Sequence, residues 1–163
     1  MKVELKVQDL LQKAANDKFY IALLRERDGN RSLPILVGLL EAQAIAMFLR
    51  DVSTERPMLH DLIAGMADAF AIRIQEVYIY KVKGGVFYSY LVCEQYGQTV
   101  NVDARTSDAI AIALHQGRPI YIDEELLAEF EEWYAEQTGE HVEIIYQTFD
   151  INEVMLAKIE NGE

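Results

Sequence analysis

The amino-acid sequence predicts an α+β fold, in which an antiparallel or mixed sheet of hairpins packs on two apolar helices and one amphipathic helix. The first observation is the set of turn sequences Asp28-Gly29, Gly84-Gly85 and Tyr96-Gly97-Gln98, each of which joins two segments rich in strand-forming residues. The second is the order of the elements, because strands and helices do not alternate strictly along the chain. A doubly wound parallel sheet is therefore disfavoured.

The expected strands combine alternating apolar side chains with β-branched and aromatic residues. They cover residues 3–7, 19–24, 33–37, 72–82, 86–93, 99–103 and 119–122, with a further segment at 142–149. Pro34 lies in the third of these segments and has no N–H group to donate to a neighbouring strand. We therefore expect this strand to begin at an edge of the sheet or to pair on one side there.

Two helices are expected to be buried because they are apolar on nearly every face. The first covers residues 39–49, where Glu41 is the charged exception. An ionised carboxylate inside a buried helix needs a partner or a shifted pKa. The second helix covers residues 106–114, and either Thr106 or Ser107 is expected to cap its N-terminus.

A third, amphipathic helix is expected to begin at Pro57, because proline favours the first helical position. Its apolar side chains recur with helical spacing and are expected to pack inward. They are Leu59, Leu62, Ile63, Met66 and Phe70. At about 100° per residue, Asp61 points away from this stripe and His60 lies on its flank.

The net charge of −12 is unevenly distributed, which suggests two parts. Residues 1–122 carry 14 acidic and 14 basic side chains, whereas residues 123–163 carry 13 acidic side chains and a single lysine. We therefore expect a neutral domain over residues 1–122 and an acidic C-terminal appendage over residues 123–163, packed on the domain or extending from it. The appendage is expected to begin with an amphipathic helix that Asp123 caps and Gly139 ends, and to contain a short helix at 151–159.

Composition excludes several classes of protein. Lysine and arginine form no cluster, which argues against a constitutive, high-affinity nucleic-acid binder. The single cysteine, Cys93, excludes a disulfide framework within the chain, and its apolar strand favours a buried structural thiol over a nucleophile. No segment approaches the ~18 apolar residues of a membrane span, and the N-terminus lacks the apolar region of a signal peptide. We expect a cytoplasmic protein without a membrane partner or an organic cofactor.

Eight polar side chains occupy positions where an apolar side chain would cost less free energy of folding. They are Glu41 in a buried helix, Arg56, His60 and Asp61 around the start of another, and Asp103, Arg105, Ser107 and Asp108 at a strand-to-helix junction. At that junction, free backbone N–H groups and the positive end of the helix dipole favour anions. This arrangement indicates a functional site.

Structural roles for the same side chains remain open. Asp103 and Asp108 would satisfy helix N–H groups with Arg105 between them, and Glu41 would form an ion pair with Arg56 or Arg105. His60 would be a hydrogen-bonded side chain on the flank of its helix. His115, in the last turn of a helix, is expected to make only a favourable dipole contact.

Three segments resemble the bifunctional nuclease family, a domain family of bacteria and plants. They are Leu33-Pro-Ile-Leu-Val-Gly-Leu-Leu-Glu-Ala-Gln-Ala-Ile-Ala, Arg56-Pro-Met-Leu-His-Asp-Leu-Ile and Val102-Asp-Ala-Arg-Thr-Ser-Asp-Ala-Ile-Ala-Ile-Ala-Leu. They occur in the order expected for the family, and the resemblance extends from about Met1 to Ile122. It implies an α+β fold, self-association into a homo-oligomer and nuclease activity on DNA and RNA.

The resemblance also implies that the family's polar motif positions fall on the eight side chains named above. On that basis we expect hydrolysis of phosphodiester bonds in transiently bound nucleic acid, with His60 as general base and Arg105 stabilising phosphate charge. A divalent ion, Mg²⁺ or Mn²⁺, would assist through carboxylate ligands. The candidate ligands are Glu41, Asp61, Asp103 and Asp108, and the candidate substrate contacts are Arg56 and Ser107.

The sequence departs from the family in two places. Leu59 stands where the family more often has threonine, and residues 150–163 correspond only to the beginning of a helical hairpin that follows the domain in many bacterial members. A second hypothesis is a non-catalytic oligomeric module for regulation or assembly, whose acidic tail shields the site or binds a basic partner. The zero net charge of residues 1–122 and the absence of a basic cluster favour it. A third, a small-anion binder beside Arg105, ranks last because Asp103 and Asp108 would repel the anion.

Overall fold

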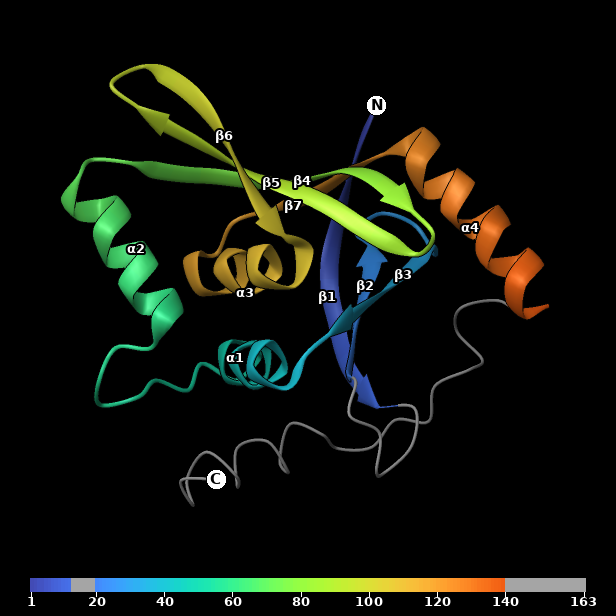
Figure 1. The fold of residues 1–163 in the computed structure, drawn as a ribbon, viewed down its shortest axis with the longest axis horizontal. Helices are drawn as coiled ribbons and strands as arrows, with labels where there is room; N and C mark the ends of the chain where they lie inside the picture. Colours follow the sequence, from blue (N-terminus) through green and yellow to red (C-terminus); the bar gives the residue numbers. More distant parts are fainter. Residues whose placement is uncertain (13–19, 140–163) are drawn as a thin grey trace.

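The computed structural model of the chain describes residues 1–12 and 20–139 (Figure 1). Their seven strands form one mixed sheet in the order β3-β2-β1-β7-β4-β5-β6. The strands are β1 (Lys2–Gln12), β2 (Tyr20–Glu26), β3 (Ser32–Val37), β4 (Arg73–Lys83), β5 (Val86–Gln95), β6 (Gln98–Arg105) and β7 (Ile120–Asp123). The helices are α1 (Leu39–Leu49), α2 (Leu59–Ala69), α3 (Thr106–Gln116) and α4 (Glu124–Thr138). The predicted α+β class with a mixed sheet of hairpins is confirmed.

The sheet consists of two antiparallel meanders, β1–β2–β3 and β4–β5–β6, that β7 joins. β7 pairs antiparallel with β1, where Lys2 is opposite Asp123, and parallel with β4, where Val77 is opposite Ile120. The edge position predicted from Pro34 is confirmed, because among the described strands β3 is the first of the sheet and pairs with β2 alone. The segments predicted at 142–149 and 151–159 lie outside the described residues.

Helix α3 lies against the middle of the sheet, and α1 packs on α3 (Figure 1). Residues 109–113 of α3 are completely or almost completely buried, as the apolar sequence predicts. The predicted burial of α1 holds for its middle, but Leu39 and Leu40 in its first turn are exposed. Arg105 is the N-cap residue of α3 without a side-chain cap, so the predicted cap by Thr106 or Ser107 is wrong.

The hydroxyl groups near the start of α3 bind the sheet instead of capping the helix. The Thr106 hydroxyl donates a hydrogen bond to Ser89 Oγ at 3.1 Å, and the Ser89 hydroxyl donates to the Ala104 carbonyl at 3.0 Å. Both side chains are buried, so this chain of hydrogen bonds ties the N-terminus of α3 to strands β5 and β6.

Helix α2 faces the opposite way from the sequence prediction. Leu59, Leu62, Met66 and Phe70 are 53–66% exposed, and of the predicted apolar stripe only Ile63 packs against the core. The helix buries His60 instead. It also begins two residues after Pro57, where the Met58 N–H donates to Asp61 Oδ2 at 2.8 Å. Helical spacing identifies side chains that share a face, but it does not identify what covers that face.

Helix α4 has the predicted ends, with Asp123 at the N-cap position and Gly139 in a left-handed conformation at its C-terminus. The Asp123 side chain forms no cap hydrogen bond, so the predicted side-chain cap is wrong. It buries Leu127, Phe130 and Tyr134 in the same core as the sheet and the other helices. The division into a domain over residues 1–122 and an appendage over residues 123–163 stays a prediction, and α4 supplies part of the core that a fragment ending at residue 122 would lose.

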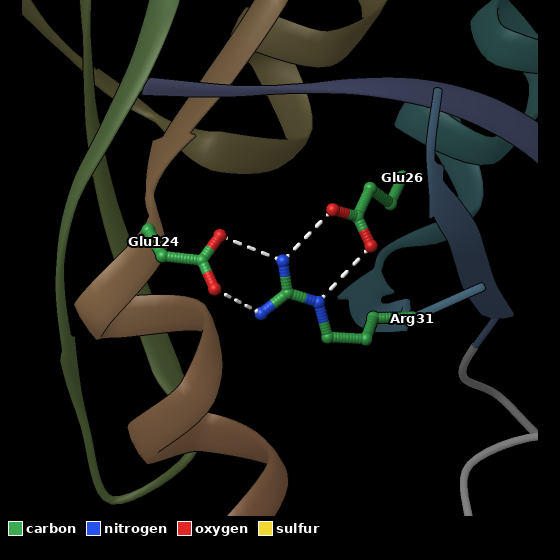
Figure 2. Close-up of polar contacts among 3 residues, drawn as sticks. All are labelled: Glu26, Arg31 and Glu124. Atoms are coloured by element: carbon green, nitrogen blue, oxygen red, sulfur yellow. Dashed lines mark hydrogen bonds and ion pairs between the residues drawn. The ribbon is translucent and has the colours of Figure 1, made fainter. Parts of the chain in front are cut away.

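Arg31 connects the start of α4 to the β2–β3 turn through ion pairs with two glutamates (Figure 2). Its guanidinium donates to Glu26 at 2.8 and 3.0 Å and to Glu124 at 2.6 and 2.7 Å. These contacts lower the carboxyl pKa of both glutamates. None of the helices in residues 1–12 and 20–139 is long and apolar enough to cross a lipid bilayer.

Candidate active site

Glu41 and Arg105 connect α1 with the start of α3. The Glu41 carboxylate, mostly buried in the first turn of α1, lies 3.5 Å from Arg105 Nη1. The predicted ion pair of Glu41 is therefore present, and its partner is Arg105. Because the Arg105 side chain is 73% exposed, most of its donors still face solvent and can reach a bound anion.

His60 is the one buried side chain of α2, with 8% of its surface exposed. Its ring lies edge-on to Phe48, with centroids 5.9 Å apart, and its Nδ1 atom has no hydrogen-bond partner within the described residues. Burial lowers the pKa of His60 below 6.5, against the opposing effect of the Asp108, Asp61 and Glu41 charges. The imidazole is therefore neutral at pH 7 and able to accept a proton.

Asp61 and His115 form a second polar pair beside His60. His115 Nε2 lies 2.6 Å from Asp61 Oδ1, and the Gln116 side chain contacts His115 Nδ1 at 2.8 Å. The pKa of Asp61 is lowered first by the Met58 backbone N–H and then by His115. The sequence prediction missed this role of His115. The seven-residue spacing from Asp108 places both side chains on one face of α3, but it does not indicate that Asp61 is the partner of His115.

A pocket of about 370 Å³ opens at the junction of β6 and α3. Its walls are Ile35 and Leu36 of β3, Gly85, Val86, Phe87 and Tyr88 of the β4–β5 hairpin, and Asp103, Ala104, Arg105, Thr106 and Ser107. Arg105 lines this pocket and also contacts Glu41, so it connects the pocket with the polar side chains around His60. The N-terminus of α3 and the Arg105 guanidinium favour an anionic group there.

The structure thus brings most of the predicted site residues into two adjoining groups. Glu41, His60, Asp61 and Asp108 interact electrostatically around His60, together with His115. Asp103, Arg105 and Ser107 line the pocket. Arg56 lies exposed in the segment between α1 and α2, where its carbonyl accepts a hydrogen bond from the Thr54 hydroxyl.

The four candidate metal ligands do not converge. Within residues 1–12 and 20–139, no three His, Cys, Asp or Glu side chains form a group that could hold a metal ion. Asp61 is bound to His115 and Glu41 to Arg105, while Asp103 lies opposite Tyr90 on the sheet. In this arrangement the carboxylates do not fit a divalent ion as a shared set of ligands.

Comparison with known proteins supports the family resemblance. Residues 22–133 match the bifunctional nuclease domain, so the match continues into α4, beyond the limit at Ile122 that the sequence motifs indicated. Two Mycobacterium tuberculosis proteins, uncharacterized protein MT1877 of strain CDC 1551 / Oshkosh and uncharacterized protein Rv1829 of strain ATCC 25618 / H37Rv, are each 42% identical over 109 residues. These residues are 67% of this chain and 65% of each relative, just under two thirds of the relative's length. The chain belongs to the bifunctional nuclease domain family.

Proposed function

We propose that this domain hydrolyses phosphodiester bonds of DNA or RNA, with His60 as the general base. The observation that supports this role best is the buried, neutral imidazole, whose Nδ1 atom has no hydrogen-bond partner among residues 1–12 and 20–139. In the proposed step, water attacks phosphorus and its proton passes to His60. The bond between phosphorus and the leaving oxygen breaks, and the leaving oxygen takes up a proton from solvent. Family membership supplies the substrate class.

Arg105 is the proposed electrostatic partner of the reaction. Its guanidinium stands at the wall of the pocket, beside the N-terminus of α3, where a phosphate group would be stabilised as negative charge builds up. Ser107 is the proposed additional contact to the substrate in the same pocket, and Arg56 a contact from the exposed segment. Glu41 positions Arg105, and His115 positions Asp61.

No step of this proposal uses Mg²⁺ or Mn²⁺, because the candidate carboxylates do not form a shared ligand group. The assay varies the ion instead. Labelled single- and double-stranded DNA and RNA are incubated with the protein in magnesium, manganese or EDTA. Cleavage that needs either ion would show that a substrate phosphate completes a site that the carboxylates leave incomplete.

The decisive comparison uses three variants purified in the same way. His60→Gln is expected to lower the cleavage rate by about 10²–10⁴-fold, as loss of a general base does. Arg105→Gln is expected to lower it as well, whereas Arg118→Gln, at an exposed arginine just after α3, should cleave like the wild type. Equal cleavage by all four proteins would mean that a contaminant cleaves or that the site is elsewhere.

The second candidate function is a non-catalytic oligomeric module, and the exposed stripe on α2 favours it. Leu59, Leu62, Met66 and Phe70 form an apolar surface of the kind that self-association covers. A folded, self-associating wild type that cleaves no substrate under any condition would support this function over the nuclease. Shielding by the acidic tail depends on residues 140–163, outside the described part of the chain.

A further inference from the structure

Five tyrosines form a row across the face of the sheet opposite α3. This tyrosine row comprises Tyr121 of β7, Tyr78 and Tyr80 of β4, and Tyr88 and Tyr90 of β5. The rings of Tyr78 and Tyr90 are stacked with centroids 5.4 Å apart, and those of Tyr80 and Tyr90 with centroids 5.2 Å apart. Tyr88 extends the row, with its ring centroid 6.4 Å from that of Tyr80. Tyr121 is opposite Tyr78 in the parallel pairing of β7 with β4.

The row faces solvent and is not part of the core. Val77, next to Tyr78 in β4, points to the other face and is fully buried. Helix α4 also packs on that other face, because its Phe130 ring contacts Phe87, whose side chain alternates with that of Tyr88. Tyr88 is consequently 38% exposed, and Tyr80 is 41% exposed.

A bulge in β4 widens the row. The register of β4 and β5 shifts between Ile79 and Lys81, so that Tyr80 and Lys81 both lie on the open face. Lys81 Nζ stands 5.1 Å from the centroid of the Tyr88 ring. At the other end of the row, Lys2 Nζ lies 5.2 Å from the Tyr121 ring centroid and 5.0 Å from the Tyr78 ring centroid. Each end of the row therefore combines an aromatic ring with a cation.

The row leads directly into the pocket at the start of α3. Tyr88 lines that pocket and is opposite Arg105 in the β5–β6 pairing. Tyr90, the next residue of the row, is opposite Asp103. A chain molecule lying along the tyrosines would therefore arrive at Arg105, the proposed phosphate contact.

We propose that the tyrosine row is a stacking platform for the bases of single-stranded nucleic acid, and that the strand passes from it to Arg105. This inference rests on the proposed nuclease function. Exposed aromatic rings on a sheet bind unpaired bases because every base presents an aromatic face, whereas the bases of a duplex are already stacked on one another. The substrate class is therefore single-stranded DNA or RNA rather than duplex.

Charges on the open face make base stacking, not phosphate neutralisation, the main source of affinity. Lys2 is already paired with Glu76, and the Tyr78 hydroxyl lies beside Asp123. With Lys81 and Arg105 as the two cations closest to the strand, about two phosphates are neutralised. The affinity for a single strand should then fall less than about tenfold between 50 and 200 mM salt.

Binding of labelled single-stranded and duplex oligonucleotides, measured by fluorescence anisotropy in EDTA on the full chain, tests the proposal without requiring cleavage. The double variant Tyr80→Ala/Tyr88→Ala should weaken single-strand binding at least tenfold, since each stacked base is worth about 5- to 150-fold in affinity. The conservative variant Tyr80→Phe/Tyr88→Phe keeps the rings and should bind within threefold of the wild type. Tyr96→Ala, in the β5–β6 turn outside the row, is the matched control and should bind like the wild type.

The proposal would be overturned if Tyr80→Ala/Tyr88→Ala bound single strands as tightly as the wild type does and melted at the same temperature. It would also be overturned if the wild type bound duplex and single strands with equal affinity. Loss of self-association in that variant, without single-strand binding by the wild type, would overturn it in favour of contact with a second copy. Failure of the nuclease proposal is recognised separately. A protein that binds single strands through the row but cleaves none keeps the platform and loses the nuclease.

Discussion

Replacing His60 by leucine is expected to stabilise the fold while it removes the proposed base. The imidazole is 8% exposed, and no group in the described part of the chain forms a hydrogen bond with its Nδ1 atom. A buried polar group without a hydrogen bond costs about 1–3 kcal/mol. The edge contact with the Phe48 ring, worth about 0.5–1.5 kcal/mol, is lost in the variant. The net expectation is a gain of about 1 kcal/mol in the free energy of unfolding, or roughly 2–4 °C in melting temperature.

The pH dependence of the same variant has a definite sign. Burial holds the pKa of His60 in the folded protein below the value of 6.5 expected in the unfolded chain. Between these two pKa values the unfolded state binds more protons, so the wild type loses stability as the pH falls below about 6.5. His60→Leu should lack this part of the pH dependence, because leucine does not titrate.

Urea and thermal unfolding at pH 7.5 and at pH 5.5 measure both effects. His115→Leu is the matched control, and it should destabilise the protein at pH 7.5, because it removes the partner of the Asp61 carboxylate. A loss of more than about 1 kcal/mol in His60→Leu would refute the reasoning, since it would show that the imidazole stabilises the fold. An unchanged pH dependence would likewise show that its titration is not coupled to folding.

Three further changes test other parts of the structure. Arg31→Met should lower the melting temperature at pH 7 and should make the melting temperature fall less between pH 7 and pH 4. Arg31 lowers the carboxyl pKa of Glu26 and Glu124. The stabilisation that it supplies is therefore present at neutral pH and is lost as these carboxylates become protonated. Phe130→Ala should cost about 3–5 kcal/mol in urea unfolding, because the ring is buried against Phe87. Leu62→Lys, on the exposed stripe of α2, should change stability by less than about 0.5 kcal/mol and weaken any self-association seen in sedimentation. A stable Phe130→Ala would contradict the burial of Phe130, and an unstable Leu62→Lys would contradict the exposure of Leu62.

Much of the candidate site was predictable because its residues break a local pattern. Glu41 stands out as a charge in an apolar helix, and Arg105 and Ser107 stand out at a strand-to-helix junction. The structure places all three at or beside one pocket. His115 was underrated because its partner, Asp61, lies on another helix 54 residues away, and no local pattern connects the two.

The tyrosine row could not be predicted from the sequence, because it too depends on contacts between residues distant in the chain. Alternation along β4 and β5 indicates that Tyr78 and Tyr80 share one face and that Tyr88 and Tyr90 share one face. Their stacking depends on the register between the two strands and on the bulge before Lys81. The position of Tyr121 beside Tyr78 depends further on the insertion of β7 between β1 and β4.

Within residues 1–12 and 20–139, the strands, the helices and the turns between them could be predicted from short-range spacing, from glycine and proline, and from hydrophobic alternation. The exposure of the apolar stripe on α2, the burial of His60 and the contact of Asp61 with His115 depend on tertiary packing. The physical reason is that periodicity specifies which side chains share a face, whereas the surface that covers this face comes from residues distant in the chain. Those distant contacts determine burial, pKa and the assembly of the site.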